Sequence, residues 1–161
     1  MDSKLQKFLD DNKIKYELHE HKKVYTAFNE AETQHVKPKE IAKVVLVKAD
    51  ENYALVVVPA QKYVDFSKVK KALSAKGGFA TGGKVKKVSM AKESDITKIL
   101  KSKIGLIHPF GNLYKLPVLA DNAILKEKKM TASAGSYTES LEIKTNDFIK
   151  HVLPTKGSFA K

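Results

Sequence analysis

The sequence predicts a mixed α/β domain built on a curved, largely antiparallel and partly barrel-like sheet surrounded by helices. Strand-like and helix-like segments are mixed without strict alternation, which argues against a doubly wound parallel sheet. Hairpin patterns dominate the middle, where residues 40–60 read EIAKVVLVKADENYALVVVPA, two apolar runs joined by a polar turn. With 161 residues the chain can bury a sizeable core. We therefore expect residues 1–161 to form a single domain.

The N-terminal part predicts a helix, a strand and a second helix. Residues 3–13 (SKLQKFLDDNK) place their apolar side chains on one helical face, with Ser3 as the expected N-cap. Residues 14–21 (IKYELHEH) alternate apolar and polar positions, as a half-buried strand does. Residues 27–35 (AFNEAETQH) have helical character and end before Pro38, which restricts the residue that precedes it.

Lys43 stands where the first apolar run of the hairpin begins. Because side chains alternate faces along a strand, Lys43 points the same way as Val45 and Val47, and Val44 and Leu46 point the other way. Both faces are apolar, so we expect the strand to be covered on both sides. A lysine near a strand end can extend its ammonium to water. Alternatively, the ammonium lines a site for an anion or a polarised carbonyl.

The second half of the chain continues the mixture of elements. Residues 64–78 predict a helix that Asp65 caps and that the glycine pair at 77–78 ends. A short strand is expected within 84–91, and a short helix within 93–103.

A rigid loop and an apolar strand follow. Residues 105–112 (GLIHPFGN) predict a loop held by Pro109. Residues 116–125 (LPVLADNAIL) predict a strand that ends near Asp121. An aspartate in this position is usually a turn or cap residue; if it faces a pocket, it can accept a hydrogen bond from a substrate ammonium.

The chain ends with two strands, a helix and a short tail. The strands are expected within 128–144 around a turn at Gly135 and Ser136. The helix is expected over 145–153, capped by one of its first two residues. The final residues, 156–161 (KGSFAK), are expected to be a frayed tail.

The net charge is +12, and all 30 basic residues are lysine. A positive field attracts polyanions, but without arginine there are no bidentate guanidinium contacts to bases or phosphates. This composition favours salt-sensitive contact with a nucleic-acid backbone over sequence readout. A lysine-rich proteome would produce the same composition without a nucleic-acid partner.

The sequence also excludes several classes of protein. It has no cysteine, so disulfides and thiolate chemistry are absent. The N-terminus lacks the apolar region of a signal peptide, and the apolar runs are too short to cross a membrane. We therefore expect a cytoplasmic protein with no membrane partner.

Several catalytic motifs are missing. There is no GxxxxGK[ST] loop, no GxSxG turn and no HExxH helix. His19 and His21 lie on one strand face and could share a metal ion, but a solvated strand face is the commoner explanation. We therefore expect no metal and no cofactor, and a nucleophilic hydrolase is disfavoured.

Five stretches of the chain, taken in order, carry a family resemblance. They are VYTAFNEAE at 24–32, IAKVVLVKADENYALVVVPA at 41–60, Gly105 with HPFG at 108–111, LPVLADNAIL at 116–125, and TASAGSYTESLEI at 131–143 followed by TNDFIK. No single stretch is specific, but the ordered set resembles the YbaK/EbsC family. This is the aminoacyl-tRNA editing domain that also occurs inserted in bacterial prolyl-tRNA synthetases. The resemblance covers nearly the whole chain and implies a curved mixed sheet.

The resemblance implies an activity. It is a free-standing trans-editing hydrolase that cleaves the ester between a wrongly loaded amino acid and the tRNA, with alanine or cysteine on tRNA-Pro as the implied substrates. Lys43 falls on the essential lysine of the family. The resemblance implies a substrate pocket formed by Tyr25, Thr26, Gly105, His108, Pro109, Phe110, Gly111, Asp121, Gly135 and Ser136.

With no nucleophile or metal apparent in the sequence, a positioned water is the expected attacker. Lys43 would either hold the terminal phosphate or adenosine or stabilise the oxyanion of the transition state. The expected partners are the acceptor end of a mischarged tRNA and an aminoacyl-tRNA synthetase. Ile107 and His108 stand where the family often has glycine and a small residue, so the resemblance does not identify the amino acid edited. The competing hypothesis is a non-enzymatic module that binds an amino acid, a nucleotide or tRNA.

Overall fold

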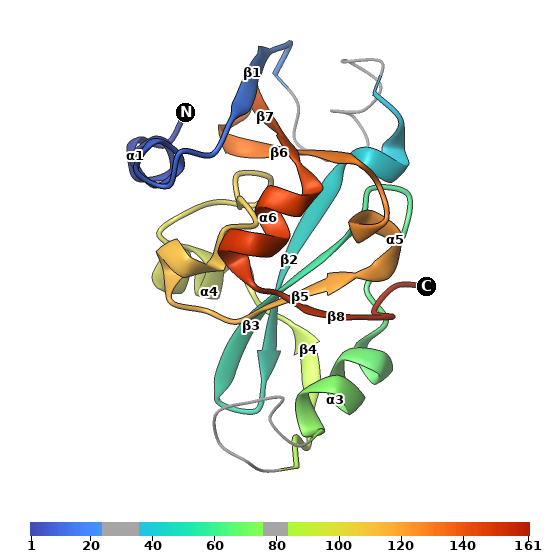
Figure 1. Ribbon diagram of the computed structural model, residues 1–161. Coiled ribbons are helices and arrows are strands. Elements are labelled where there is room, and N and C mark those ends of the chain that lie inside the picture. Colours follow the sequence, from blue (N-terminus) through green and yellow to red (C-terminus); the bar gives the residue numbers. More distant parts are fainter. Residues whose placement is uncertain (24–35, 76–83) are drawn as a thin grey trace.

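The computed structural model of the protein describes residues 1–23, 36–75 and 84–161. Within these residues the strands form two sheets, one of five strands and one of three, with helices packed around them (Figure 1). The predicted mixed α/β class is confirmed. The barrel-like part of the prediction is not, because the described strands form two sheets that close no barrel.

The five-stranded sheet contains the predicted hairpin. Its strands, in spatial order, are β4 (Val88–Met90), β2 (Ala42–Ala49), β3 (Asn52–Pro59), β5 (Val118–Asp121) and β8 (Thr155–Gly157). β2 pairs antiparallel with β3, as the hairpin pattern predicts, and also antiparallel with β4. β5 and β8 extend the sheet in parallel, so the sheet is mixed.

Both faces of β2 are covered, as the apolar pattern predicts. Ala42 and Leu46 belong to a cluster that also contains buried side chains of the three-stranded sheet and of several helices. Val47 and Ala49 belong to a second cluster on the other face, under the helix of residues 66–74. Strand parity therefore assigns Lys43 to the face of this second cluster.

The three-stranded sheet is antiparallel. Its order is β1 (Tyr16–Glu20), β7 (Glu139–Lys144) and β6 (Lys129–Ser136). A parallel bridge between Ile41 and Thr131 connects it to the five-stranded sheet. β1 is less buried than its alternation predicts, because Leu18 is 41% exposed and only Ile14, just before the strand, is fully enclosed.

The predicted turn at Gly135 and Ser136 is misplaced. Both residues lie at the end of β6, where the pairing with β7 is irregular between Ser133 and Ser136. Gly135 has a φ of +87°, a conformation that glycine adopts without steric cost. A glycine that looks like a turn residue in the sequence therefore forms a bulge, and the chain reverses at residues 137–138.

Two helices pack beside the sheets, and an aspartate caps the N-terminus of each. α1 (Ser3–Asp11) is capped by Asp2 instead of the predicted Ser3: the Asp2 carboxylate accepts hydrogen bonds from the backbone N–H of residues 4 and 5, at 2.8 and 3.1 Å. α3 (Phe66–Ser74) is capped by Asp65, as predicted. α1 lies near β1 and β7, and α3 lies beside β4 at the other end of the molecule (Figure 1).

The remaining helical elements are short. They are η1 (Pro38–Glu40), α4 (Glu93–Asp95), which continues into η2 (Ile96–Leu100), η3 (Gly111–Tyr114), α5 (Asn122–Leu125) and α6 (Thr145–Val152). Neither of the first two residues of α6 caps it, because the N-cap position is Lys144 and no side chain bonds there. The predicted helix at 27–35 and the glycine pair at 77–78 lie outside the described residues.

The C-terminal residues are not a frayed tail, so that prediction is wrong. β8 pairs with β5, and Phe159 and Ala160 are buried. Lys161 exchanges two backbone hydrogen bonds with Tyr63, at 2.8 and 3.1 Å. The tail is held because its backbone N–H groups find acceptors in other parts of the chain.

Within the described parts of the chain, no helix is both long enough and apolar enough to span a bilayer.

Candidate functional site

Lys43 is the second residue of β2 and pairs with Val58 of β3. Its Nζ donates a hydrogen bond to the backbone carbonyl of Lys62 and lies 4.6 Å from the ring centroid of Tyr63. Partial burial lowers the pKa of this ammonium below its ordinary value. Among the described residues no carboxylate forms an ion pair with it. Lys43 is therefore a half-buried cation that can accept an anionic partner.

The contacts of Lys43 are supplied by a segment that the C-terminus holds. Tyr63 donates its backbone N–H to the carbonyl of Lys161 at 3.1 Å and accepts from the N–H of Lys161 at 2.8 Å. Val64 forms an isolated bridge with Ala160 in the same place. The Tyr63 side chain is 71% exposed, so its ring presents a face to solvent beside the ammonium. Tyr63 was not among the site residues predicted from the sequence, and only its position just after β3 could have indicated it.

Asp121 lies on the same face of the sheet as Lys43. Val57 of β3 pairs with Ala120 of β5, so Asp121, the last residue of β5, lies at the level of Val58. Val58 in turn pairs with Lys43 of β2. The Asp121 carboxylate is 4% exposed. These three residues lie side by side on three neighbouring strands. Two strand spacings therefore separate the backbones of Lys43 and Asp121, a distance of about 10 Å.

The oxygens of Asp121 are already hydrogen-bonded. Oδ1 accepts from the N–H of Phe159 at 2.7 Å and from the N–H of Ala160 at 3.0 Å. Oδ2 accepts from the N–H of Ala123 at 2.9 Å, which caps α5. These contacts are those of a cap residue, which is one of the two roles that the sequence left open for Asp121. Contact with a substrate ammonium stays a prediction.

The loop from His108 to Gly111 is built into the core. Phe110 is fully buried in the cluster that also contains Ala42 and Leu46, on the face of β2 opposite to Lys43. The His108 ring stacks on Tyr114 with centroids 4.6 Å apart, and its Nδ1 accepts from the N–H of Phe110 at 3.3 Å. The described structure therefore brings this loop against the core and not against Lys43.

Close packing explains the glycine that ends this loop. A Cβ at Gly111 would lie 2.4 Å from Cγ2 of Val118 and 2.6 Å from the carbonyl oxygen of Leu116. No side chain fits there without moving β5 or the η3 turn.

The other two predicted glycines, Gly105 and Gly135, both have a positive φ. Gly135 faces Asp2, where an added Cβ would lie 2.9 Å from the Cβ of Asp2. Gly105 has a φ of +85°, and the residue before it accepts a hydrogen bond from the Tyr137 hydroxyl at 3.2 Å. The Ser136 hydroxyl oxygen accepts from the N–H of Thr138 at 3.1 Å.

The ten predicted substrate contacts therefore divide into groups. Gly135 lies against Asp2, and Phe110 of the His108–Gly111 loop contacts Phe8 of α1. Gly105 and Ser136 are chain neighbours of Ile104 and Tyr137, which are hydrogen-bonded to each other, and Asp121 shares the face of Lys43. Tyr25 and Thr26 lie outside the described residues.

Burial of His108 predicts a pH-dependent stability. Its pKa falls from an ordinary 6.5 to about 4, mainly because burial disfavours the charged ring. The folded state therefore binds fewer protons than the unfolded state between these values. The contribution of His108 to the free energy of unfolding is therefore at its full value above pH 6.5. It is lost as the pH falls towards 4, which lowers the free energy of unfolding by about 2–4 kcal/mol.

The measurement is urea unfolding of the wild type and of His108→Asn at pH 7, 6, 5 and 4. Asparagine keeps an acceptor for the N–H of Phe110 but does not titrate, so the free energy of unfolding should fall less steeply with acid. An equal slope in His108→Asn would contradict the assignment to His108.

Comparison with known proteins identifies the family. A model of the aminoacyl-tRNA editing domain matches residues 21–151. Among solved structures, hypothetical protein APE2540 superimposes with a TM-score of 0.84 at 17% identity, covering 99% of this chain and 100% of the other. A candidate trans-editing enzyme for prolyl-tRNA synthetase superimposes with a TM-score of 0.75 at 16% identity, covering 98% and 94%.

A third solved structure shows the same fold within a longer protein. It is a candidate signal transduction protein from Marinobacter aquaeolei VT8, with a TM-score of 0.72 and 15% identity. The match covers 99% of this chain and 31% of that one. The family model extends over most of the chain, including the hairpin with Lys43 and the strand with Asp121. The chain belongs to the aminoacyl-tRNA editing domain family.

Proposed function

We propose that this protein is a trans-editing deacylase that hydrolyses a mischarged aminoacyl-tRNA, with alanine or cysteine on tRNA-Pro as the substrate class. The observation that carries the proposal is Lys43, a half-buried ammonium without a carboxylate partner among the described residues, in a chain of the editing family. A cation in this setting is suited to a substrate that is anionic and develops further negative charge as it reacts. Residues 1–161 would act as one domain.

The chemistry is hydrolysis of an ester. A water attacks the carbonyl carbon of the aminoacyl group, and the carbonyl oxygen becomes an oxyanion. When the bond to the ribose oxygen breaks, that oxygen leaves with a proton and the free amino acid is released. In this proposal the Lys43 ammonium either stabilises the oxyanion or holds the terminal phosphate, and both roles need its positive charge.

The exposed ring of Tyr63 fits the same substrate. Proteins commonly bind single-stranded RNA ends by stacking unpaired bases on aromatic rings. Tyr63 presents such a ring directly beside Lys43, so we assign it to the terminal adenine. The net charge of +12 would attract the acceptor end, and the synthetase that makes the error would supply the mischarged tRNA.

Editing by size explains why such an activity is needed. One methylene changes binding by only about 1–3 kcal/mol, so a synthetase cannot exclude a smaller amino acid by affinity alone. In this proposal the editing pocket admits the smaller amino acid and excludes the correct one by size.

The test is deacylation of a panel of aminoacyl-tRNAs by the full chain. The panel contains Ala-, Cys-, Ser- and Pro-tRNA-Pro, with Ala-tRNA-Ala as a correctly charged control. We expect hydrolysis of one mischarged species at a rate at least tenfold above that of Pro-tRNA-Pro. If no ester is hydrolysed, the proposal fails. A thermal shift with free adenosine or amino acid would then indicate a binding module.

A further inference from the structure

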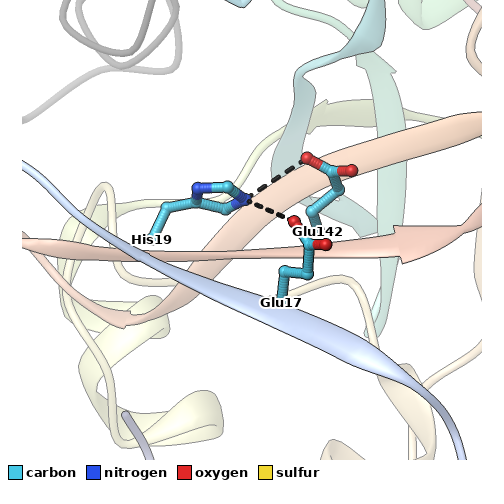
Figure 2. Close-up of side chains that lie close together, drawn as sticks. All are labelled: Glu17, His19 and Glu142. Carbon is cyan, nitrogen blue, oxygen red and sulfur yellow. Dashed lines mark ion pairs between the residues drawn. The ribbon is translucent and has the colours of Figure 1, made fainter.

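Three metal-ligating side chains meet on the three-stranded sheet, whereas Lys43 belongs to the five-stranded sheet. Glu17 and His19 belong to β1, and Glu142 belongs to β7. Glu17 is the direct register partner of Glu142, and His19 lies two residues further along the same face of β1. Figure 2 shows the His19 ring directed at both carboxylates.

The distances suit one metal ion. His19 Nε2 lies 3.6 Å from Oε2 of Glu17 and 3.3 Å from Oε2 of Glu142. The three donor atoms all lie within 4.8 Å of one another. Ligand atoms bound to one tetrahedral zinc at about 2.0–2.2 Å are about 3.4 Å apart. Small side-chain rotations would therefore bring all three atoms into coordination.

His19 gives a second, independent observation. Its Nε2 atom is shielded from solvent and has no hydrogen-bond partner among the described residues. The two carboxylate oxygens lie close to this nitrogen, so a metal ion placed between the three groups would bind all three donor atoms.

The nearest lysine does not fill this position. Lys129 Nζ lies 3.3 Å from Oε1 of Glu142, the oxygen that does not face His19. The Lys129 ammonium therefore pairs with that oxygen. It leaves Oε2 of Glu142 directed at His19.

We propose that Glu17, His19 and Glu142 bind a divalent ion of the zinc class, with water in the remaining position. One imidazole nitrogen and two carboxylate oxygens form a ligand set that zinc accepts. The pairing differs from the His19 and His21 pair considered from the sequence. Both ring nitrogens of His21 are already engaged, with the Lys22 carbonyl and the Ser140 hydroxyl, each at 2.7 Å.

The bound ion would have a structural effect. It would tie the edge strand β1 to the central strand β7, in addition to their backbone hydrogen bonds. This proposal does not depend on the editing activity, because its residues lie on the other sheet from Lys43.

The experiment is calorimetric titration of the metal-free full chain with zinc sulfate, together with thermal melting. We expect one zinc per chain in the wild type. His19→Gln should abolish binding, and Glu17→Gln should weaken it at least tenfold. With zinc at a hundredfold excess over Kd, the wild-type melting temperature should rise by about 5–10 °C.

His21→Gln is the matched control, since it removes a neighbouring histidine that the proposal does not use. It should bind zinc like the wild type. Glu17 is 74% exposed, so Glu17→Gln tests the site without risk to folding. The proposal is overturned if the wild type shows no saturable binding, if Glu17→Gln and His19→Gln bind as the wild type does, or if His21→Gln loses the ion instead.

Discussion

Replacing Lys43 with alanine is expected to lower the deacylation rate by about 10²–10³-fold, the usual effect of removing one donor that stabilises an oxyanion. The melting temperature should change little. Lys43 stands at the start of β2, and its ammonium contacts only the Lys62 carbonyl and the Tyr63 ring among the described residues. Single-turnover hydrolysis of the preferred mischarged tRNA measures the first effect, and circular dichroism measures the second.

Lys62→Ala is the matched control. It removes one positive charge from the same segment but keeps the backbone carbonyl that Lys43 contacts. Its rate should stay within a few-fold of the wild type. Equal losses in the two variants would point to general attraction of tRNA. A folded Lys43→Ala variant with full activity would refute the assigned role, and loss of cooperative melting would make Lys43 a structural lysine.

Asp121→Ala is expected to have the largest effect on stability. The variant leaves the N–H groups of Phe159, Ala160 and Ala123 without their acceptor. An unsatisfied buried donor costs about 1–3 kcal/mol, so we expect a loss of about 3–5 kcal/mol in the free energy of unfolding. Urea unfolding measures this loss. Amide hydrogen exchange at residues 159 and 160 should become faster at the same time.

Asp65→Ala provides the comparison. Asp65 also accepts two backbone N–H groups, but at the exposed start of α3, so its loss should cost about 1 kcal/mol. If Asp121→Ala costs no more than this, the carboxylate does not hold the C-terminal segment. If Asp121→Ala keeps its stability but loses deacylation, the carboxylate contacts the substrate ammonium instead.

Local patterns predicted the parts of the fold that depend on local contacts. The parity of the hairpin placed Lys43 on the correct face, and Asp65 was identified as the cap of α3 because both signals lie within a few residues. The C-terminal segment was misjudged because its partners are distant: β8 pairs in parallel with β5, and Asp121 accepts the N–H groups of Phe159 and Ala160. No local pattern reports such contacts.

The candidate site was predictable only in part for the same reason. The sequence identified Lys43 as a candidate site residue but could not show that the Tyr63 ring would lie beside its ammonium. The backbone of Lys161, far along the chain, holds Tyr63 in place. Gly135 was assigned to a turn because glycine favours turns and bulges alike. The choice between them depends on pairing with β7, which the sequence of β6 does not contain.

The pairing of β1 with β7 dictates the order in which the chain can fold as it is synthesised. Tyr16 pairs with Ile143, and β1 has no other strand partner among the described residues. At about 5–20 residues per second, the ribosome needs roughly 6–25 s to reach β7 after it has made β1. The β2–β3 hairpin, whose partners are adjacent in the chain, can form during that interval. β1, which is made before the other described strands, is thus among the last of them to be paired, and it must remain free of other partners until then.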